Sequence, residues 1–106
     1  MAIAWNVSWI MEMLRTQLKH KKVLLIARSG PVVEALENAL RIHAGVRTAM
    51  FHEGMSLLER DQAAAYFAED SYGAQILLCS EIGSEGRNFQ FASDLILFDL
   101  PANPDV

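Results

Sequence analysis

A chain of 106 residues that is 52% hydrophobic and 21% charged is expected to form one globular domain, and this composition argues against disorder. The net charge of −4 provides no overall positive field toward nucleic acid or anionic membranes, so any nucleic-acid contact is expected to be local. The single cysteine excludes an internal disulfide framework and suits a reducing cytoplasm, and no apolar run approaches the ~20 residues of a membrane span.

The first half of the chain predicts a helix, a strand and a second helix. Apolar residues recur at helical spacing over residues 5–18, and the two tryptophans in this stretch are expected to anchor the core. The uninterrupted apolar run Val23–Ala27 is typical of a buried strand. After the loop 28–30, Pro31 stands where a first helical residue is expected, and Gly45 marks the end of that helix.

The middle of the chain predicts a weaker strand followed by a capped helix. Val46–Phe51 predicts the strand, although an arginine and a threonine interrupt its apolar residues. Ser56 and Glu59 have the spacing of a capping box, which predicts a helix from there to about Glu69. The residues expected on the buried face of this helix are Leu57, Ala64, Phe67 and Ala68.

Two further apolar runs complete a predicted parallel sheet. Ile76–Cys79 is uninterrupted, which is typical of a strand buried on both faces, and Leu95–Phe98 has the same character. Strands that alternate with helices of this length imply crossover connections, so we expect a parallel sheet with helices on both faces. The predicted fold class is therefore α/β.

A polar loop with two glycines, residues 80–88, is the first candidate for a binding site. Loops that follow the carboxyl ends of parallel strands line the crevice where ligands bind in open α/β sheets. Ser80 can donate to a phosphate, Arg87 can pair with one, and Asn88 can bond a sugar hydroxyl. The glycines either allow close approach of a ligand or only serve turns, and the residues alone leave both interpretations open.

Several common enzyme motifs are absent from the sequence. It contains neither the Walker phosphate loop nor the Gly-x-Gly-x-x-Gly dinucleotide fingerprint, and His52-Glu53 lacks the second histidine of a zinc protease. The seven residues between Cys79 and Arg87 are too many for a phosphatase-type loop, so Cys79 is expected to be a small core residue. Asp99 lacks the acidic neighbours of a phosphoacceptor site.

Three stretches resemble helicase motifs and occur in the helicase order. Residues 51–56, Phe-His-Glu-Gly-Met-Ser, together with Arg60 resemble motif IVa of superfamily-two helicases and translocases. Residues 76–89, Ile-Leu-Leu-Cys-Ser-Glu-Ile-Gly-Ser-Glu-Gly-Arg-Asn-Phe, resemble motif V, and residues 23–29 fit motif IV. Within this superfamily, the motifs look most like those of Swi/Snf-type ATPases that associate with bacterial RNA polymerase.

The resemblance implies a RecA-like fold, in which a three-layer parallel sheet forms the second of two motor lobes. Residues 1–106 would then be a single partial domain, the N-terminal part of the helicase C-terminal lobe with motifs IV, IVa and V. Motif VI with its arginine finger is absent, as is the first lobe with its Walker lysine and metal-binding acidic pair. The parent protein would be an ATP hydrolase, whereas this chain alone is expected to hold no catalytic residue and to be inactive.

The resemblance also implies site residues, position by position. The residues expected to contact nucleic acid are Ser29, His52, Gly54, Arg60 and Ser80. The residues expected to contact ATP are Glu85, Gly86, Arg87 and Asn88. Some relatives carry an arginine in place of Glu85, and related members carry an aspartate in place of Asn88. No metal ligand is expected within the chain.

The function implied is that of an ATP-dependent translocase that moves on double-stranded DNA, associates with RNA polymerase and promotes polymerase recycling in transcription. The full-length protein would use ATP with Mg²⁺, and no cofactor is expected on this chain alone. The expected partners are double-stranded DNA, RNA polymerase and the first motor lobe, with no membrane contact and a nucleoid-associated place in the bacterial cytoplasm. Two other interpretations remain open: a stand-alone α/β binding module for a phosphorylated ligand, and a polymerase-interaction domain.

Overall fold

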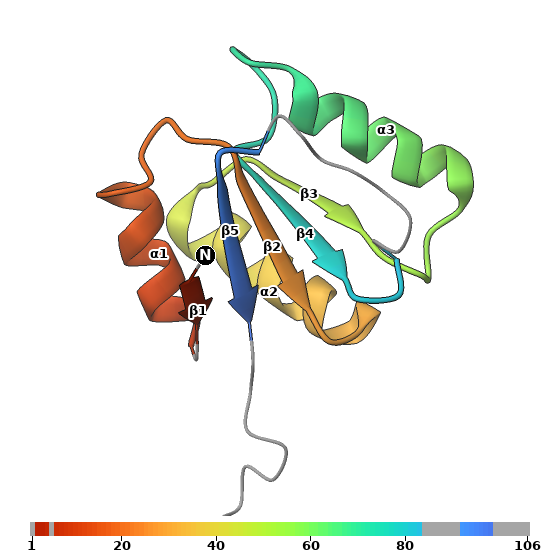
Figure 1. The fold of residues 1–106 in the computed structure, drawn as a ribbon, viewed down its shortest axis with the longest axis horizontal. Coiled ribbons are helices and arrows are strands. Elements are labelled where there is room, and N and C mark those ends of the chain that lie inside the picture. The colour runs from red at the N-terminus through yellow and green to blue at the C-terminus, as the bar shows by residue number, and fades with distance from the viewer. Residues whose placement is uncertain (1, 5, 84–91, 99–106) are drawn as a thin grey trace, which may run out of the picture.

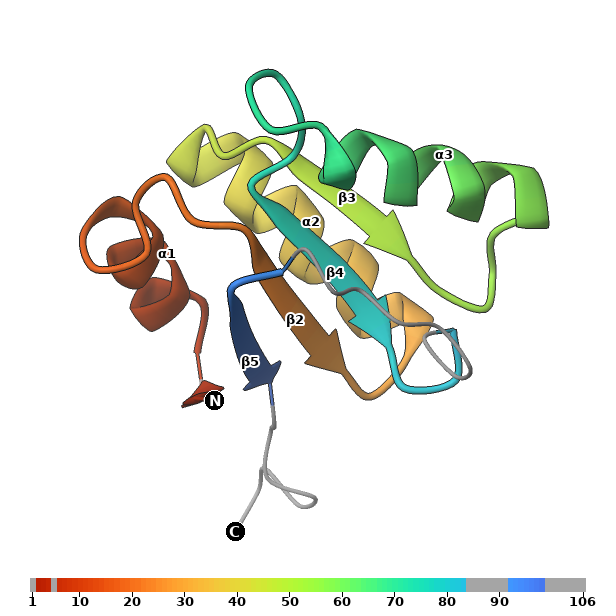
Figure 2. The same cartoon turned by 45° about the horizontal axis from the view of Figure 1, so that its top comes forward.

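Five parallel strands form one sheet, in the order β1-β5-β2-β4-β3. The computed structural model describes residues 2–4, 6–83 and 92–98. The strands are β1 (Ala2–Ala4), β2 (Val23–Ala27), β3 (Thr48–Phe51), β4 (Ile76–Ser80) and β5 (Asp94–Phe98). The helices are α1 (Val7–Arg15), α2 (Gly30–Ala44) and α3 (Leu57–Ala68). Helices α1 and α2 cover one face of the sheet and α3 covers the other, so the predicted three-layer α/β fold is confirmed (Figures 1 and 2).

Strand β4 lies inside the sheet, between β2 and β3, and every one of its residues is buried. This confirms the prediction from its uninterrupted apolar sequence, because a strand with helices over both faces needs apolar side chains at every position. In β2 the fully buried residues alternate with half-buried ones. The alternation places Val23, Leu25 and Ala27 toward α1 and α2, and Leu24 and Ile26 toward α3.

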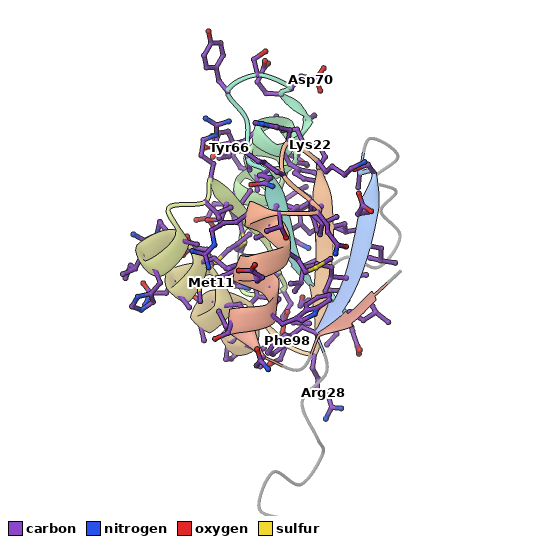
Figure 3. The ribbon with its side chains drawn as sticks, turned by 90° about the vertical axis from the view of Figure 1, so that its left-hand side faces the viewer. Met11, Lys22, Arg28, Tyr66, Asp70 and Phe98 are labelled. Carbon is purple, nitrogen blue, oxygen red and sulfur yellow. The ribbon has the colours of Figure 1, made fainter. Side chains whose placement is uncertain are left out.

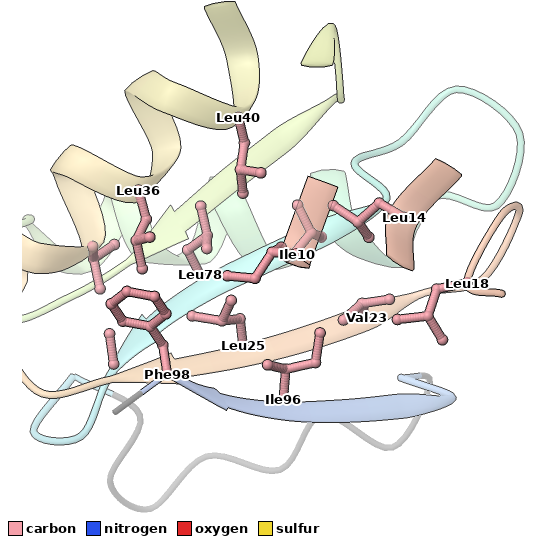
Figure 4. Close-up of a cluster of buried hydrophobic side chains, with 13 residues drawn as sticks. Ile10, Leu14, Leu18, Val23, Leu25, Leu36, Leu40, Leu78, Ile96 and Phe98 are labelled. Atoms are coloured by element: carbon pink, nitrogen blue, oxygen red, sulfur yellow. The ribbon is translucent and has the colours of Figure 1, made fainter. Parts of the chain in front are cut away.

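Two hydrophobic cores result, one on each face of the sheet. The larger core lies beneath α1 and α2 and takes Leu25, Leu78 and Ile96 from three adjacent strands (Figure 4). The smaller core lies beneath α3 and includes Phe67, Leu77 and Cys79. Cys79 is fully buried, as predicted, and burial raises the pKa of its thiol to about 12, which leaves no reactive thiolate at neutral pH.

Local signals fix the ends of the helices. The side chain of Asn6 accepts a hydrogen bond from the Trp9 amide (2.9 Å) and caps α1. Helix α2 ends at Gly45, whose φ of 63° is the left-handed conformation that glycine adopts without strain. The predicted capping box of α3 is present, with Ser56 and Glu59 each bonded to the other's backbone amide (3.1 and 2.8 Å).

One strand and two element boundaries differ clearly from the predictions. Strand β1 was not predicted, and it pairs with β5 at the edge of the sheet. Helix α1 ends at Arg15, although Leu18 beyond it is still buried in the core. Strand β3 begins at Thr48, and Arg47 before it donates from its side chain to the carbonyl oxygen of Gly73, 3.0 Å away.

The predicted buried face of α3 is partly wrong. Phe67 is fully buried and Ala64 is half-buried, but Leu57 is 66% exposed and Ala68 is also exposed. At about 100° per residue, Leu57 and Ala68 lie roughly 80–100° from Phe67 around the helix axis, on the flanks of the stripe that faces the sheet. Of the two tryptophans, Trp9 is half-buried against the larger core, and Trp5 lies outside the described residues.

Candidate functional site

The carboxyl ends of the inner strands meet at one edge of the sheet, which we call the carboxyl edge. The loops 28–29, 52–56 and 81–83 leave this edge after β2, β3 and β4 (Figure 2). Motif-type residues from each of these loops lie together here because parallel strands all end on the same side.

Glu53 joins two of the loops through its carboxylate. Its Oε2 accepts a hydrogen bond from the Gly30 amide at the start of α2, 3.1 Å away. The Ser80 hydroxyl at the end of β4 also stabilises the charged form of this carboxylate. Three donors, namely the Ser80 hydroxyl first and then the amides of Glu53 itself and Gly30, hold the pKa of this carboxyl below its usual range. Glu53 therefore sits as an anion at the N-terminus of α2.

Ser80 is completely buried, at the end of β4. Its hydroxyl oxygen accepts a hydrogen bond from the Gly83 amide, 2.9 Å away.

His52 is also buried, with 6% of its surface exposed, and it lies at the centre of the carboxyl edge. Its Nδ1 accepts a hydrogen bond from the Gly54 amide, 3.0 Å away, and its carbonyl oxygen accepts one from the Met55 amide at 3.1 Å. These bonds fix the turn that carries motif IVa.

Three glycines pack against His52 with no room for a side chain. A Cβ on Gly83 would lie 2.6 Å from both the His52 Cα and the Ser80 Oγ. On Gly54 it would lie 2.9 Å from the imidazole Cε1, and on Gly30 it would lie 3.0 Å from Nδ1. The close approach that Gly83 allows is therefore an approach of the loop to the protein itself.

Arg60 and Ser29 have donors that the described residues leave unused. The guanidinium carbon of Arg60 lies 5.9 Å from the centroid of the Phe51 ring, and its Nε is buried without an acceptor among the described residues. Ser29 is the N-cap residue of α2, but its side chain makes no capping hydrogen bond.

The structure thus brings Ser29, His52, Gly54 and Ser80 together, with Arg60 on the first turns of the adjoining helix α3. The four residues expected to contact ATP, 85–88, lie outside the described residues. Sequence reasoning did not select Glu53 as a site residue. The signal was present, because an acidic residue directly after a strand lies at the edge where helix N-termini offer amide donors.

Within the described part of the chain, no three His, Cys, Asp or Glu side chains are grouped closely enough to hold a metal ion. Among the same residues, no helix has the length and apolar character needed to span a membrane.

Comparison with known proteins identifies the family. The model of the helicase conserved C-terminal domain matches residues 5–106. The chain belongs to this family. The resemblance of its three motifs to those of a second helicase lobe is therefore confirmed.

Relatives in several bacteria carry the same domain. The chain is 59% identical over 101 residues to the RNA polymerase-associated protein RapA of Vibrio vulnificus (strain YJ016). This match covers 95% of the chain and 10% of the relative. It is 58% identical over 106 residues to the protein of the same name from Proteus mirabilis (strain HI4320), covering 96% and 11% respectively. The chain therefore spans about a tenth of the length of these relatives.

Among solved structures, this helicase C-terminal domain resembles the Hef helicase domain of Pyrococcus furiosus. The TM-score is 0.67, and the match covers 93% of this chain and 26% of the Hef chain at 14% identity. At this identity the similarity concerns the fold alone, which is that of a helicase lobe.

Proposed function

We propose that this domain forms part of the second motor lobe of a RapA-like ATPase, which couples ATP hydrolysis to movement on double-stranded DNA. In this role it would act with RNA polymerase and promote polymerase recycling in transcription. The observation that carries the proposal is the carboxyl edge, where residues of three helicase motifs meet. The chain belongs to the helicase C-terminal family and is 57–59% identical to RapA proteins. The names of those relatives state an association with RNA polymerase, and the DNA and ATP steps are our proposal.

The nucleic-acid contacts we propose are Ser29, His52, Gly54, Arg60 and Ser80. Their gathering at one edge supports a shared surface for a phosphate backbone, to which hydroxyl, amide and guanidinium donors are suited. Because Ser80 is completely buried, a phosphate can contact its hydroxyl only after the residues that cover it move.

The proposed ATP contacts are Glu85, Gly86, Arg87 and Asn88, which follow β4 in the sequence and lie outside the described residues. A nucleotide bound at these residues would carry Mg²⁺. The first motor lobe would supply the phosphate-binding lysine and the ligands of the metal. The proposed role of this chain is to connect that nucleotide with the DNA bound at the carboxyl edge.

Arg60 offers the clearest test of the DNA contact. Replacing Ser80 would also remove the hydrogen bond that holds Gly83, whereas Arg60→Gln removes a half-buried cation of helix α3. We expect Arg60→Gln to weaken binding of a short labelled DNA duplex by about threefold or more at low salt, since phosphate contacts dominate such affinities. Fluorescence anisotropy with the full chain measures this.

The matched control is Arg41→Gln, which removes an exposed cation from the last turn of α2, away from the carboxyl edge. It should leave duplex affinity within about twofold. Equal weakening by both variants would reduce DNA binding to a general charge effect and contradict the proposed site. Binding of inorganic phosphate without duplex binding would favour a module for a small phosphorylated ligand.

A further inference from the structure

A basic pocket lies at the other end of the sheet, where strands β2, β3 and β4 begin. We call this side the amino edge. Figure 3 shows Lys22 and Asp70 at this end and Arg28 and Phe98 at the opposite end. The pocket has a volume of about 280 Å³ and is formed by the loop between α1 and β2, the loop between α3 and β4, and Arg47 before β3. The proposed DNA surface and this pocket thus lie at opposite ends of the strands.

The pocket gathers cations in a chain that is acidic as a whole. All three lysines of the sequence, Lys19, Lys21 and Lys22, line it together with Arg47. Asp70 is the one carboxylate among the lining residues. The net charge of the chain is −4, so this local excess of positive charge is opposite in sign to the whole. The ligand that suits such a pocket is an anion.

Two of the four cations build the wall of the pocket. The Lys22 ammonium donates to the carbonyl oxygens of Glu69 (2.6 Å) and Ala74 (2.7 Å) and lies 5.6 Å from the centroid of the Phe67 ring. The Arg47 guanidinium donates to the carbonyl oxygens of Gly73 (3.0 Å) and Ser71 (3.3 Å). Carbonyl oxygens carry only partial charges, so these bonds fix the α3–β4 loop without cancelling either positive charge.

The other two cations, Lys19 and Lys21, are exposed. Lys19 and Lys21 take part in no ion pair or side-chain hydrogen bond within the described part of the chain. Their backbone is nevertheless held in place, because their amides donate to the carbonyl oxygens of Thr16 (3.2 Å) and Leu18 (3.0 Å). His20 between them adopts a φ of 65°, a conformation that is uncommon outside glycine.

The α1–β2 loop is also anchored to the core and to the sheet. Leu18 is buried with 8% of its surface exposed, and its carbonyl oxygen accepts a hydrogen bond from the Gln75 side chain at 2.9 Å. The two exposed lysines therefore extend from a fixed support, which lowers the entropic cost of ordering them on a ligand.

We propose that this pocket binds an acidic peptide segment of a partner protein, with Lys19 and Lys21 pairing with its carboxylates. A DNA duplex cannot enter a pocket with a volume of about 280 Å³, so its phosphates would reach only the rim. Asp70 further disfavours a phosphodiester, which carries a charge at every link. A peptide can place an uncharged residue or an amide donor against Asp70 instead. This proposal does not depend on the DNA or ATP steps proposed above.

The test compares binding of fluorescein-labelled hexaglutamate and hexaglutamine peptides by the full chain. We expect the chain to bind hexaglutamate and not hexaglutamine, with an affinity that falls as salt is raised. Lys19→Gln with Lys21→Gln should weaken hexaglutamate binding by about fivefold or more. Because both side chains are exposed, circular dichroism of this double variant should match that of the wild type.

The matched control is Arg28→Gln with Arg41→Gln, which removes the same charge from exposed positions outside the pocket. It should change hexaglutamate affinity by less than about twofold. Equal weakening by both double variants, or no binding of hexaglutamate, would overturn the proposal. If the Lys19 and Lys21 substitutions weaken binding of a DNA duplex more than they weaken binding of hexaglutamate, the proposal is overturned in favour of nucleic acid.

Discussion

Glu53 is the side chain that links the loops of the carboxyl edge. Its carboxylate accepts a hydrogen bond from the Gly30 amide, the first amide of α2. The Ser80 hydroxyl at the end of β4 also stabilises the charged carboxylate. Hydrogen bonds to the charged form of an acid stabilise that form, which is why the pKa of Glu53 is lowered. The edge is therefore held by an anion that belongs to the protein.

The stability contributed by Glu53 should depend on pH. Because the folded-state pKa lies below the ordinary value of 4.5, the stabilisation is present above that value and is lost as pH falls through the folded pKa. Urea unfolding should show that Glu53→Gln is less stable than the wild type at about pH 7 and that the difference narrows toward about pH 3. A difference that stays constant over this range would contradict the assignment.

A Ser80→Ala background provides the control for this experiment. The Ser80 hydroxyl is the largest cause of the lowered pKa, so the pH dependence caused by Glu53→Gln should shrink when that hydroxyl is absent. Such a double-mutant cycle separates the hydrogen bond from the general effect of removing a charge.

The sequence predicted some of these residues and not their bonds. His52, Gly54 and Ser80 stand out because they belong to motifs that follow strands, and the structure places them at one edge. The effect of Ser80 on the Glu53 carboxylate depends on how β3 packs beside β4, which no local pattern encodes. The fit of Gly83 against His52 is tertiary for the same reason.

Helix α3 buries few of its side chains against the sheet. Phe67 is its one fully buried residue, and Leu57 and Leu58 in its first turn are 66% and 67% exposed. A helix with so narrow a buried stripe relies on its ends, and here the N-terminal end is fixed by the capping box.

Ser56→Ala should therefore destabilise the chain measurably. Loss of an N-cap hydroxyl typically lowers the free energy of unfolding by about 1 kcal/mol, and urea denaturation detects such a change. Ser8→Ala, an exposed serine inside α1, is the matched control and should stay within about 0.5 kcal/mol of the wild type. If both variants unfold at the same urea concentration, the capping box does not support α3 as described.

At the scale of elements, strong local signals predicted the structure well. The apolar run of β4, the capping box of α3 and the glycine that ends α2 are each visible in a few residues. Strand β1 could not be predicted because it has three residues and becomes a strand only by pairing with β5. The exposure of Leu57 depends likewise on which side of α3 meets the sheet.

At the scale of the whole molecule, the two ends of the sheet differ in chemistry. The carboxyl edge holds the motif residues and an anionic Glu53, whereas the amino edge gathers all the lysines. The parallel arrangement produces this separation, because every loop that follows a strand lies on one side and every loop that precedes one lies on the other.

The chain by itself is expected to show no ATP hydrolysis above background, with or without duplex DNA. The sequence contains no Walker loop to hold the phosphates, and the described residues include no cluster of three metal ligands. A phosphate-release assay on the purified chain measures this. DNA-dependent hydrolysis that co-purifies with the chain through successive columns would contradict the expectation.

The pairing of β1 with β5 also has a consequence for the order of folding. Ala2 lies beside Ile96, so β1 can find its neighbouring strand only after all the residues between the two strands have been synthesised. Before β5 has been synthesised, β2 can pair only with β4, and β1 has no partner strand in this sheet. Contacts between residues so distant in sequence are slow to form, and we expect the docking of β1 to be the last step in completing the sheet.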